Sequence, residues 1–213
     1  MPFSSVLGAS SVIRPGVCTS TTRPSVPYEG QLIYETDTDR VAAYNGSAWV
    51  YTHSSGLIVI KSKTDYTAAS SFTVDNIFTS DFSNYLIRIA STGSAAVTAQ
   101  LRVGGVAATT NYNTQAAEAV NATAWTVYKN TAQTNADIGS IGVTKGFLDL
   151  YVFGPQLAAQ TGFFGNCVYG GTSSAPGTTL RWSNHSTATA YDGIAISFSG
   201  ANTGSYIIYG FNQ

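Results

Sequence analysis

The chain has 213 residues, of which 44% are hydrophobic and only 10% are charged, against about 25% in a typical soluble domain. Its net charge is −1 and its basic residues are scattered singly, which excludes the positive stripe that binds nucleic acid. No apolar run approaches the ~20 residues that span a bilayer, so we expect no membrane insertion. The abundance of Ser, Thr, Asn, Gly and aromatic residues favours strands and tight turns over exposed helices.

The low charge indicates that neighbouring subunits cover much of the surface; a merely Ser/Thr-rich soluble surface is the other interpretation. Cys18 and Cys167 lie far apart in sequence and form no disulfide framework, so we expect two unpaired thiols. The N-terminal residues lack the basic start and continuous apolar run of a signal peptide. We therefore expect a protein made in the cytoplasm.

Residues 1–27 contain four of the six prolines and show little periodicity. Proline removes backbone donors and favours extended conformations. We interpret this segment as an extended arm that attaches to a partner, with a disordered tail as the alternative.

Residues 28–56 contain three short strand-like runs, Leu32–Tyr34, Val41–Tyr44 and Trp49–Tyr51. The first break, Thr36–Asp39, has side chains that bond their own backbone in turns. The second contains Asn45-Gly46, a strong hairpin signal. The pattern predicts a small antiparallel meander, which must bury its apolar face against another domain or against copies of itself because so small a unit is marginally stable alone.

Residues 57–213 predict one antiparallel β-sandwich, with a jelly roll as the arrangement considered. Apolar residues alternate with polar ones over several runs, which is typical of strands with one buried face. Strands are expected near 57–61, 71–75, 84–90, 97–103, 123–129, 138–143, 147–153, 163–169, 179–182, 193–198 and 205–211. Thr114–Val120 is the one candidate for a turn of helix, or else a loop.

Two of these strands place apolar residues on both faces. The outward positions of Phe147–Phe153 carry three aromatic residues, and Tyr206–Tyr209 is apolar throughout. An aromatic face opposite the core face is expected where a sheet meets a partner. A core that uses both faces is the alternative.

No catalytic or cofactor-binding motif occurs, and no cysteine or histidine spacing fits a metal site. His185 and Asp192 are close in sequence, but no serine is marked as a nucleophile, so we interpret His185 as a loop histidine. Glu35, Asp37 and Asp39 alternate and could bind a hard cation, or could form a solvated face and shape the turn. We expect no enzyme, metal or cofactor.

Three aromatic residues in expected loops, Trp125, Trp182 and Tyr191, are candidates for stacking on sugar rings. The sequence around Trp182, TTLRWSNHS, adds hydrogen-bonding groups. The alternative is that Trp182 closes the end of the sandwich.

The segment Thr19–Tyr51 resembles a short module that recurs in structural proteins of tailed phages, particularly tail and fibre proteins. The matching positions are Ser20, Thr21, Arg23, Pro24, Pro27, Glu29, Gly30, Ile33, Tyr34, Asp37, Thr38, Tyr44, Asn45, Gly46 and Trp49. Its layout also resembles the trimerising foldon of phage fibritin, although the loop lengths differ. The remaining domain is similar, in composition and pattern, to jelly-roll-like knobs on phage fibres and capsid decorations.

This resemblance implies a virion structural protein, made in the host cytoplasm and assembled as a homotrimeric tail fibre, spike or appendage subunit. The arm would bind other virion proteins, and the sandwich would bind a glycan or protein of the host surface. The residues expected to form the trimer contacts are Leu32, Ile33, Tyr34, Tyr44, Trp49 and Tyr51. The alternatives are a capsid decoration or head-fibre protein and, in another class, a glycan-degrading tail enzyme with two carboxylates about 5–9 Å apart.

Overall fold

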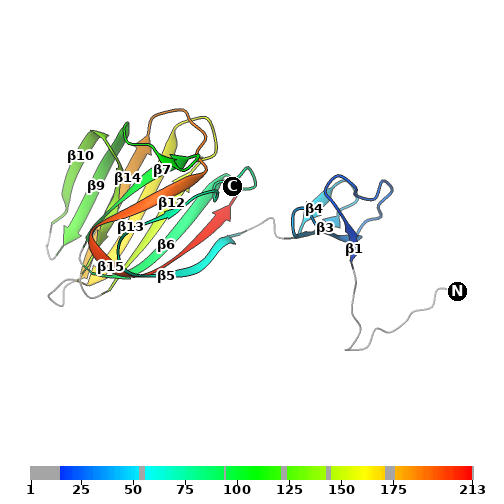
Figure 1. Cartoon of the computed structure of the whole chain (residues 1–213), viewed down its shortest axis with the longest axis horizontal. Helices are drawn as coiled ribbons and strands as arrows, with labels where there is room; N and C mark the ends of the chain where they lie inside the picture. Colours follow the sequence, from blue (N-terminus) through cyan, green and yellow to red (C-terminus); the bar gives the residue numbers. More distant parts are fainter. Residues whose placement is uncertain are drawn as a thin grey trace. The chain divides into compact units, whose positions relative to one another are not determined.

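The structure is a computed structural model, in which the chain forms two compact units, Met1–Ser54 and Ser55–Gln213. The residues that it describes are 15–52, 56–93, 95–120, 124–142, 145–170 and 176–212. Every regular element in these ranges is a β-strand (Figure 1). The all-β prediction is therefore confirmed.

The smaller unit contains a four-stranded sheet in the order β1-β2-β3-β4. Its strands are β1 (Gly16–Cys18), β2 (Leu32–Glu35), β3 (Arg40–Tyr44) and β4 (Trp49–Tyr51). β2, β3 and β4 pair antiparallel, as the meander pattern indicated. The tight turn forms at Asn45-Gly46, where Gly46 has a φ of 90° and the Asn45 carboxamide accepts the backbone N–H groups of Ser47 and Ala48.

β1 lies inside the segment that we predicted to be an arm. It pairs in parallel with β2, with Val17 opposite Tyr34. Just after it, the backbone N–H and hydroxyl of Ser20 donate to Asp37 at 2.8 and 2.6 Å. The described part of the predicted arm is thus bound to the meander, whereas residues 1–14 lie outside the described residues. A three-residue strand paired with a distant segment has no periodicity of its own, so the sequence did not reveal it.

The larger unit is one curled sheet in the order β10-β9-β14-β13-β12-β6-β15-β7-β11, with β5 paired to β15 and β8 to β7. All of its pairings are antiparallel. The strands are β5 (Ile58–Val74), β6 (Asn84–Thr92), β7 (Ala95–Val103), β8 (Val106–Ala107), β9 (Tyr112–Val120), β10 (Thr126–Gln133), β11 (Ala136–Ile141), β12 (Gly146–Phe153), β13 (Thr161–Gly170), β14 (Pro176–His185) and β15 (Gly193–Phe211).

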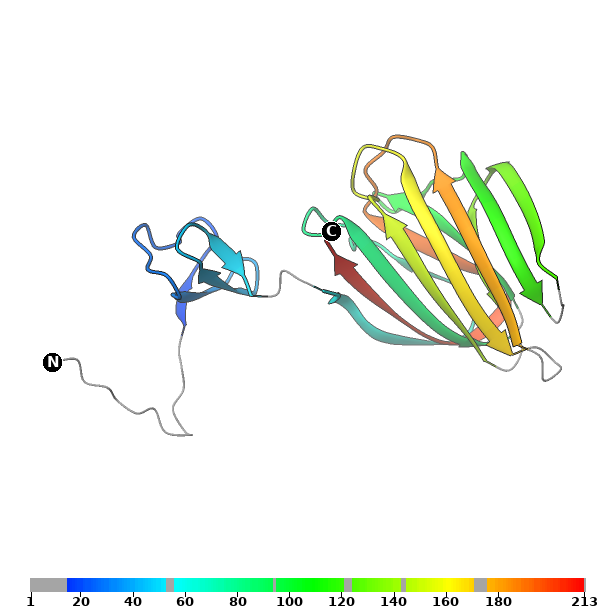
Figure 2. The ribbon, with the colours of Figure 1, turned by 180° about the vertical axis from the view of Figure 1, so that it is seen from behind.

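The sheet forms a two-layered sandwich because β5 and β15 pass from one layer into the other (Figure 2). Residues 193–198 of β15 pair with β7, and residues 203–211 pair with β6. The register shifts between Ser197 and Asn202, where the strand changes layer. Two pairs of strands that we predicted separately, 57–61 with 71–75 and 193–198 with 205–211, are therefore single long strands.

The core lies between the two layers and follows the predicted alternation. It includes the fully buried side chains of Ile87, Ile89, Val97, Leu101, Leu148, Leu150, Ile194 and Ile196. The layers approach closely at a glycine of the core face. A Cβ atom on Gly165 of β13 would lie 2.1 Å from the carbonyl oxygen of Ile138 on β11.

The segment Thr114–Val120 is not the helical turn or loop that we expected: it is part of strand β9. Its alanines, glutamine and glutamate favour helix locally. However, β9 hydrogen-bonds to β10 on one side and to β14 on the other, and Thr114 and Ala116 are buried on its inner face. Two flanking ladders outweigh a local preference of a few tenths of a kcal/mol per residue.

Replacing Gly165 by alanine should lower the free energy of unfolding by about 1–3 kcal/mol, because the added methyl group would collide with backbone that has little freedom to move. Urea unfolding of the variant and the parent protein measures this. Gly162→Ala on the same strand is the matched control, since its Cβ would meet only the Phe153 side chain at an ordinary 3.6 Å. Equal stability of the two variants would contradict the close approach of the layers.

Candidate binding surfaces

On one face of the smaller sheet, the buried carboxylate of Glu35 binds the segment that contains Arg23. Glu35 is fully buried and accepts from Arg23 Nε at 2.5 Å, and from the hydroxyls of Tyr51 and Thr38 at 3.0 Å each. The hydrogen bond from Arg23 lowers the pKa of Glu35, with Tyr51 and Thr38 acting in the same direction against the effect of burial. This network holds the Arg23 segment to the sheet.

The alternating acids Glu35, Asp37 and Asp39 have separate partners. Asp37 binds Ser20, and Asp39 accepts the Tyr34 hydroxyl at 2.7 Å. The interpretation of all three acids as a solvated face was wrong for Glu35, because Glu35 is buried. Among the described residues, no three acids, histidines or cysteines are grouped so that they could hold a metal ion.

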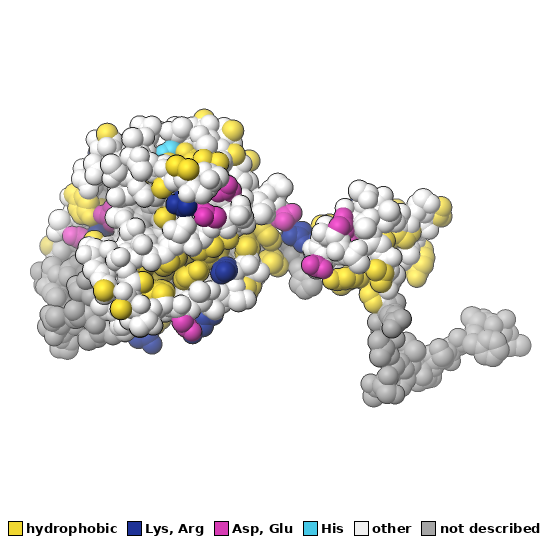
Figure 3. Space-filling view, viewed as in Figure 1, with side chains coloured by type: hydrophobic (Ala, Val, Ile, Leu, Met, Phe, Trp, Pro, Cys, Tyr) yellow, Lys and Arg dark blue, Asp and Glu magenta, His cyan; other side chains and the backbone are white. Residues whose placement is uncertain are grey.

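The opposite face of the smaller sheet is apolar, and among the described residues of this unit it is partly exposed. Because side chains alternate along a strand, the pairings place six residues on it: Val17, Leu32, Tyr34, Val41, Ala43 and Val50. Val17 is 69% exposed, and Leu32 and Val50 are 41% exposed. Figure 3 shows hydrophobic side chains gathered on this unit. We call these six residues the apolar face.

The six residues predicted to form trimer contacts divide between the two faces. Leu32 and Tyr34 belong to the apolar face, whereas Ile33, Tyr44, Trp49 and Tyr51 lie on the opposite one. Ile33 is buried, and the rings of Tyr44 and Trp49 pack at 5.4 Å. Successive side chains of a strand point to opposite faces, so this alternation along each predicted strand would have assigned the six residues to their two faces. Val50 was missed because it lies between two aromatic residues.

A row of aromatic side chains crosses the outer face of the larger sheet. Trp182 on β14 is opposite Phe164 on β13, which is opposite Tyr151 on β12. The ring centroids are 5.9 Å apart for the first pair and 6.2 Å for the second. Trp182 is 47% exposed. We call these three residues the aromatic row.

The aromatic row continues beyond Tyr151. Phe153 stacks on Tyr151 at 6.2 Å, and Phe211 meets it edge-on at 6.3 Å. Tyr151 and Phe153 are two of the three outward aromatic residues that the sequence predicted for Phe147–Phe153. The third, Phe147, is 49% exposed and lies under the Lys145 ammonium at 5.3 Å.

Polar side chains surround a shallow depression of about 430 Å³ beside Trp182. They include Gln115, Lys129, Asn113 and Asn184. The Asn113 carboxamide donates to Asn184 at 3.0 Å and accepts from the Ala132 N–H at 3.2 Å, which fixes its orientation. Gln115 and Lys129 are exposed, and their side chains hydrogen-bond to no other described residue.

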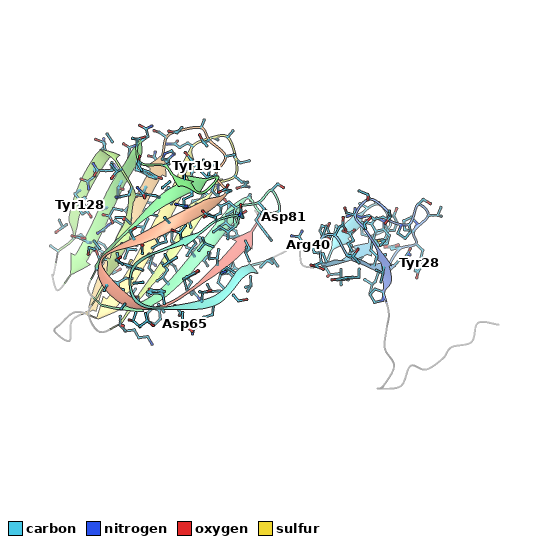
Figure 4. All side chains as sticks on the ribbon, in the orientation of Figure 1. Tyr28, Arg40, Asp65, Asp81, Tyr128 and Tyr191 are labelled. Carbon is cyan, nitrogen blue, oxygen red and sulfur yellow. The ribbon has the colours of Figure 1, made fainter. Side chains whose placement is uncertain are left out.

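The other two aromatic residues proposed to contact sugar do not join the row. Trp125 is 52% exposed but precedes β10. Tyr191, labelled in Figure 4, is only 4% exposed, so its prediction as an exposed loop residue was wrong. The loop after β14 folds over the end of the sandwich and buries it, with the Tyr191 hydroxyl 3.1 Å from Nδ1 of His185.

His185 is the last residue of β14 and not a loop residue. It is 1% exposed, between the rings of Tyr112 and Tyr191 at 4.5 and 5.3 Å. Burial lowers its pKa, against hydrogen bonds to backbone groups. Asp192 accepts from the Gly104 N–H instead of contacting His185. His53 lies outside the described residues.

Two carboxylates meet at Arg181, a buried residue of β14. Its Nε donates to Asp137 at 3.0 Å and its Nη2 to Glu118 at 2.7 Å. Burial lowers the pKa of Arg181, but the two carboxylates outweigh it and the pKa is raised. Tyr128 (Figure 4) donates to Asp137 at 2.8 Å and lies under the guanidinium at 5.2 Å. Both acids thus have Arg181 as a fixed cationic partner, and the two ion pairs link β14 to β9 and β11.

Comparison of the sequence with models of protein families gave no match, and comparison with curated proteins gave none either. Cys18 and Cys167 are free thiols, as expected. No helix in the described ranges is long and apolar enough to cross a membrane.

The hydrogen bonds of Glu35 should make the smaller unit sensitive to acid. Since its folded pKa lies below the ordinary 4.5, the unfolded state binds more protons, and the stabilisation is complete above about pH 4.5 and lost as the pH falls below it. Hydrogen exchange at pH 7 and pH 3.5 should show a loss of amide protection in β2 and β3.

Glu35→Gln should have weak protection at both pH values, whereas Asp39→Asn, which changes an acid in the adjoining turn, should keep the response of the parent protein. A residual acid response is expected from Asp37, whose pKa is also lowered by its bonds to Ser20. Unchanged protection in Glu35→Gln would contradict this role of the carboxylate.

Proposed function

We propose that this chain is a non-enzymatic structural subunit of a tailed-phage virion, assembled as a homotrimeric tail fibre or appendage. In this proposal the smaller unit joins identical copies and the larger unit binds the host surface. The observation that carries the proposal is the apolar face of the smaller sheet.

The apolar face calls for a partner because the described part of the smaller unit offers little that could bury it. The sheet has four short strands, and its other face is already closed by the Arg23 segment. Small isolated sheets are marginally stable in water, and contiguous exposed apolar patches mark interaction sites. The same patch is present on every copy, so identical copies packed around a common axis can cover it.

The resemblance of Thr19–Tyr51 to modules of phage tail and fibre proteins supports the virion assignment and the trimer. The low charge of the chain supports it too, since an assembled subunit exposes less of its surface to water. A trimer also places three copies of the larger unit side by side, so that weak sites gain avidity through high effective concentration.

The mass of the full-length protein in solution tests the assembly. At micromolar concentration, light scattering after gel filtration should give three times the chain mass. The double variant Leu32→Lys and Val50→Lys should be monomeric, because two buried charges without partners would oppose association. Both residues are exposed in the single chain, so its fold should survive.

Val26→Lys is the matched control: Val26 belongs to the same unit, is 90% exposed and lies outside the apolar face. It should leave the trimer intact. A parent protein that is monomeric at micromolar concentration would refute self-association, as would a double variant that stays trimeric.

Particle location tests the virion assignment. A gold-labelled antibody raised against the purified protein should decorate tail appendages of the phage that encodes it. Label confined to the head would replace the tail assignment with a head fibre or capsid decoration, and particles without any label would refute a virion role.

A further inference from the structure

We propose that the aromatic row of the larger sheet binds a glycan chain, with Trp182 as the main stacking platform. This inference rests on the proposed function, since it names the class of ligand that the larger unit would bind on a host surface. The site differs from the loop aromatic residues that the sequence suggested, because it lies on the face of the sheet.

The geometry of the row fits a chain of sugar rings. Neighbouring strands lie about 4.8 Å apart, and the ring centroids of Trp182, Phe164 and Tyr151 follow at 5.9 and 6.2 Å. Successive ring planes differ by only 31° and 29°. The three side chains therefore form an unbroken aromatic row that runs across the strands, with steps on the scale of one pyranose unit. The C–H faces of pyranoses are apolar and flat enough to stack on such rings.

Groups that can bind hydroxyls lie next to the platform. Gln115 and Lys129 extend the row beyond Trp182, because the pairings place Gln115 opposite Trp182 and Lys129 opposite Gln115. Asn184 lies two residues after Trp182 on β14. Its side-chain oxygen accepts a hydrogen bond from Asn113, and its side-chain nitrogen donates to no other described residue. Binding sites for small ligands are usually depressions lined by apolar and aromatic side chains, with a few polar groups that orient the ligand.

Other ligand classes fit this surface less well. Lys129 is the only charged residue among the described residues that line the depression, whereas nucleic acid requires several cations along its path. A second copy of the chain would have to place hydrogen-bond partners against the side-chain amides of Gln115 and Asn184, since burying them without partners costs free energy. A hydroxyl-rich ligand supplies partners for these amides and covers the rings at the same time.

Purified bacterial polysaccharides test the inference. Full-length protein is applied to an array of immobilised O-antigen chains, capsular polysaccharides and wall teichoic acids, and oligosaccharide fragments of those that bind are titrated by calorimetry. Trp182→Ala should weaken binding about tenfold or more, while Trp182→Phe, which keeps an aromatic ring, should retain most of the affinity.

Trp125→Ala is the matched control, because Trp125 has nearly the same exposure, 52% against 47%, but lies outside the row. It should leave the affinity unchanged. An equal loss in Trp125→Ala would overturn the inference, and so would the absence of binding to every polysaccharide on the array.

The mass of each variant separates this inference from the proposed function. Trp182→Ala should have the same assembly mass and melting temperature as the parent protein. A change in its mass would mean that the row is a contact between copies, which overturns the glycan site. A trimer that binds no glycan refutes this inference alone, and a monomer that binds through Trp182 refutes only the assembly.

Discussion

The larger unit depends on the bend of β15, which belongs to both layers of the sandwich. Asn202 is buried at this bend and its amide donates to the carbonyl of Gly200 at 2.8 Å. Just beyond it, Gly204 lies so close to β6 that a Cβ would be 2.1 Å from the Ala90 carbonyl oxygen. The bend preserves the alternation of the strand, since Ile196 before it and Ile208 after it both face the core. The strand therefore contributes side chains to the core in both layers.

Four arginines among the described residues are paired with acids of their own unit. Arg88 forms two hydrogen bonds of 2.8 Å with Asp149 across neighbouring strands, and Arg102 binds Asp75 at 2.7 Å. Arg181 and Arg23 are paired with acids in the same way. The view in Figure 3 accordingly shows a surface that is largely neutral, with isolated charged groups. A surface of this kind offers stacking, apolar contact and neutral hydrogen bonds more than charge, which suits both proposed surfaces.

The elements that the sequence predicted best are those with local signals. The three runs of the meander, the turn at Asn45-Gly46 and the alternating run at β12 all appear where expected. Strand β9 was missed because its alanine-rich sequence carries no strand preference of its own. The apolar face was only partly found, because aromatic residues were grouped by size and not by the side of the strand on which they lie.

The sequence by itself determined that the chain is all-β, that its strands have one buried face, and that few charges remain for its surface. Only the tertiary structure decided which residues share a surface. Alternation is a property of one strand, and so it can be read from the sequence. Register between strands depends on long-range hydrogen bonds and core packing, and these alone bring Tyr151, Phe164 and Trp182 into one row.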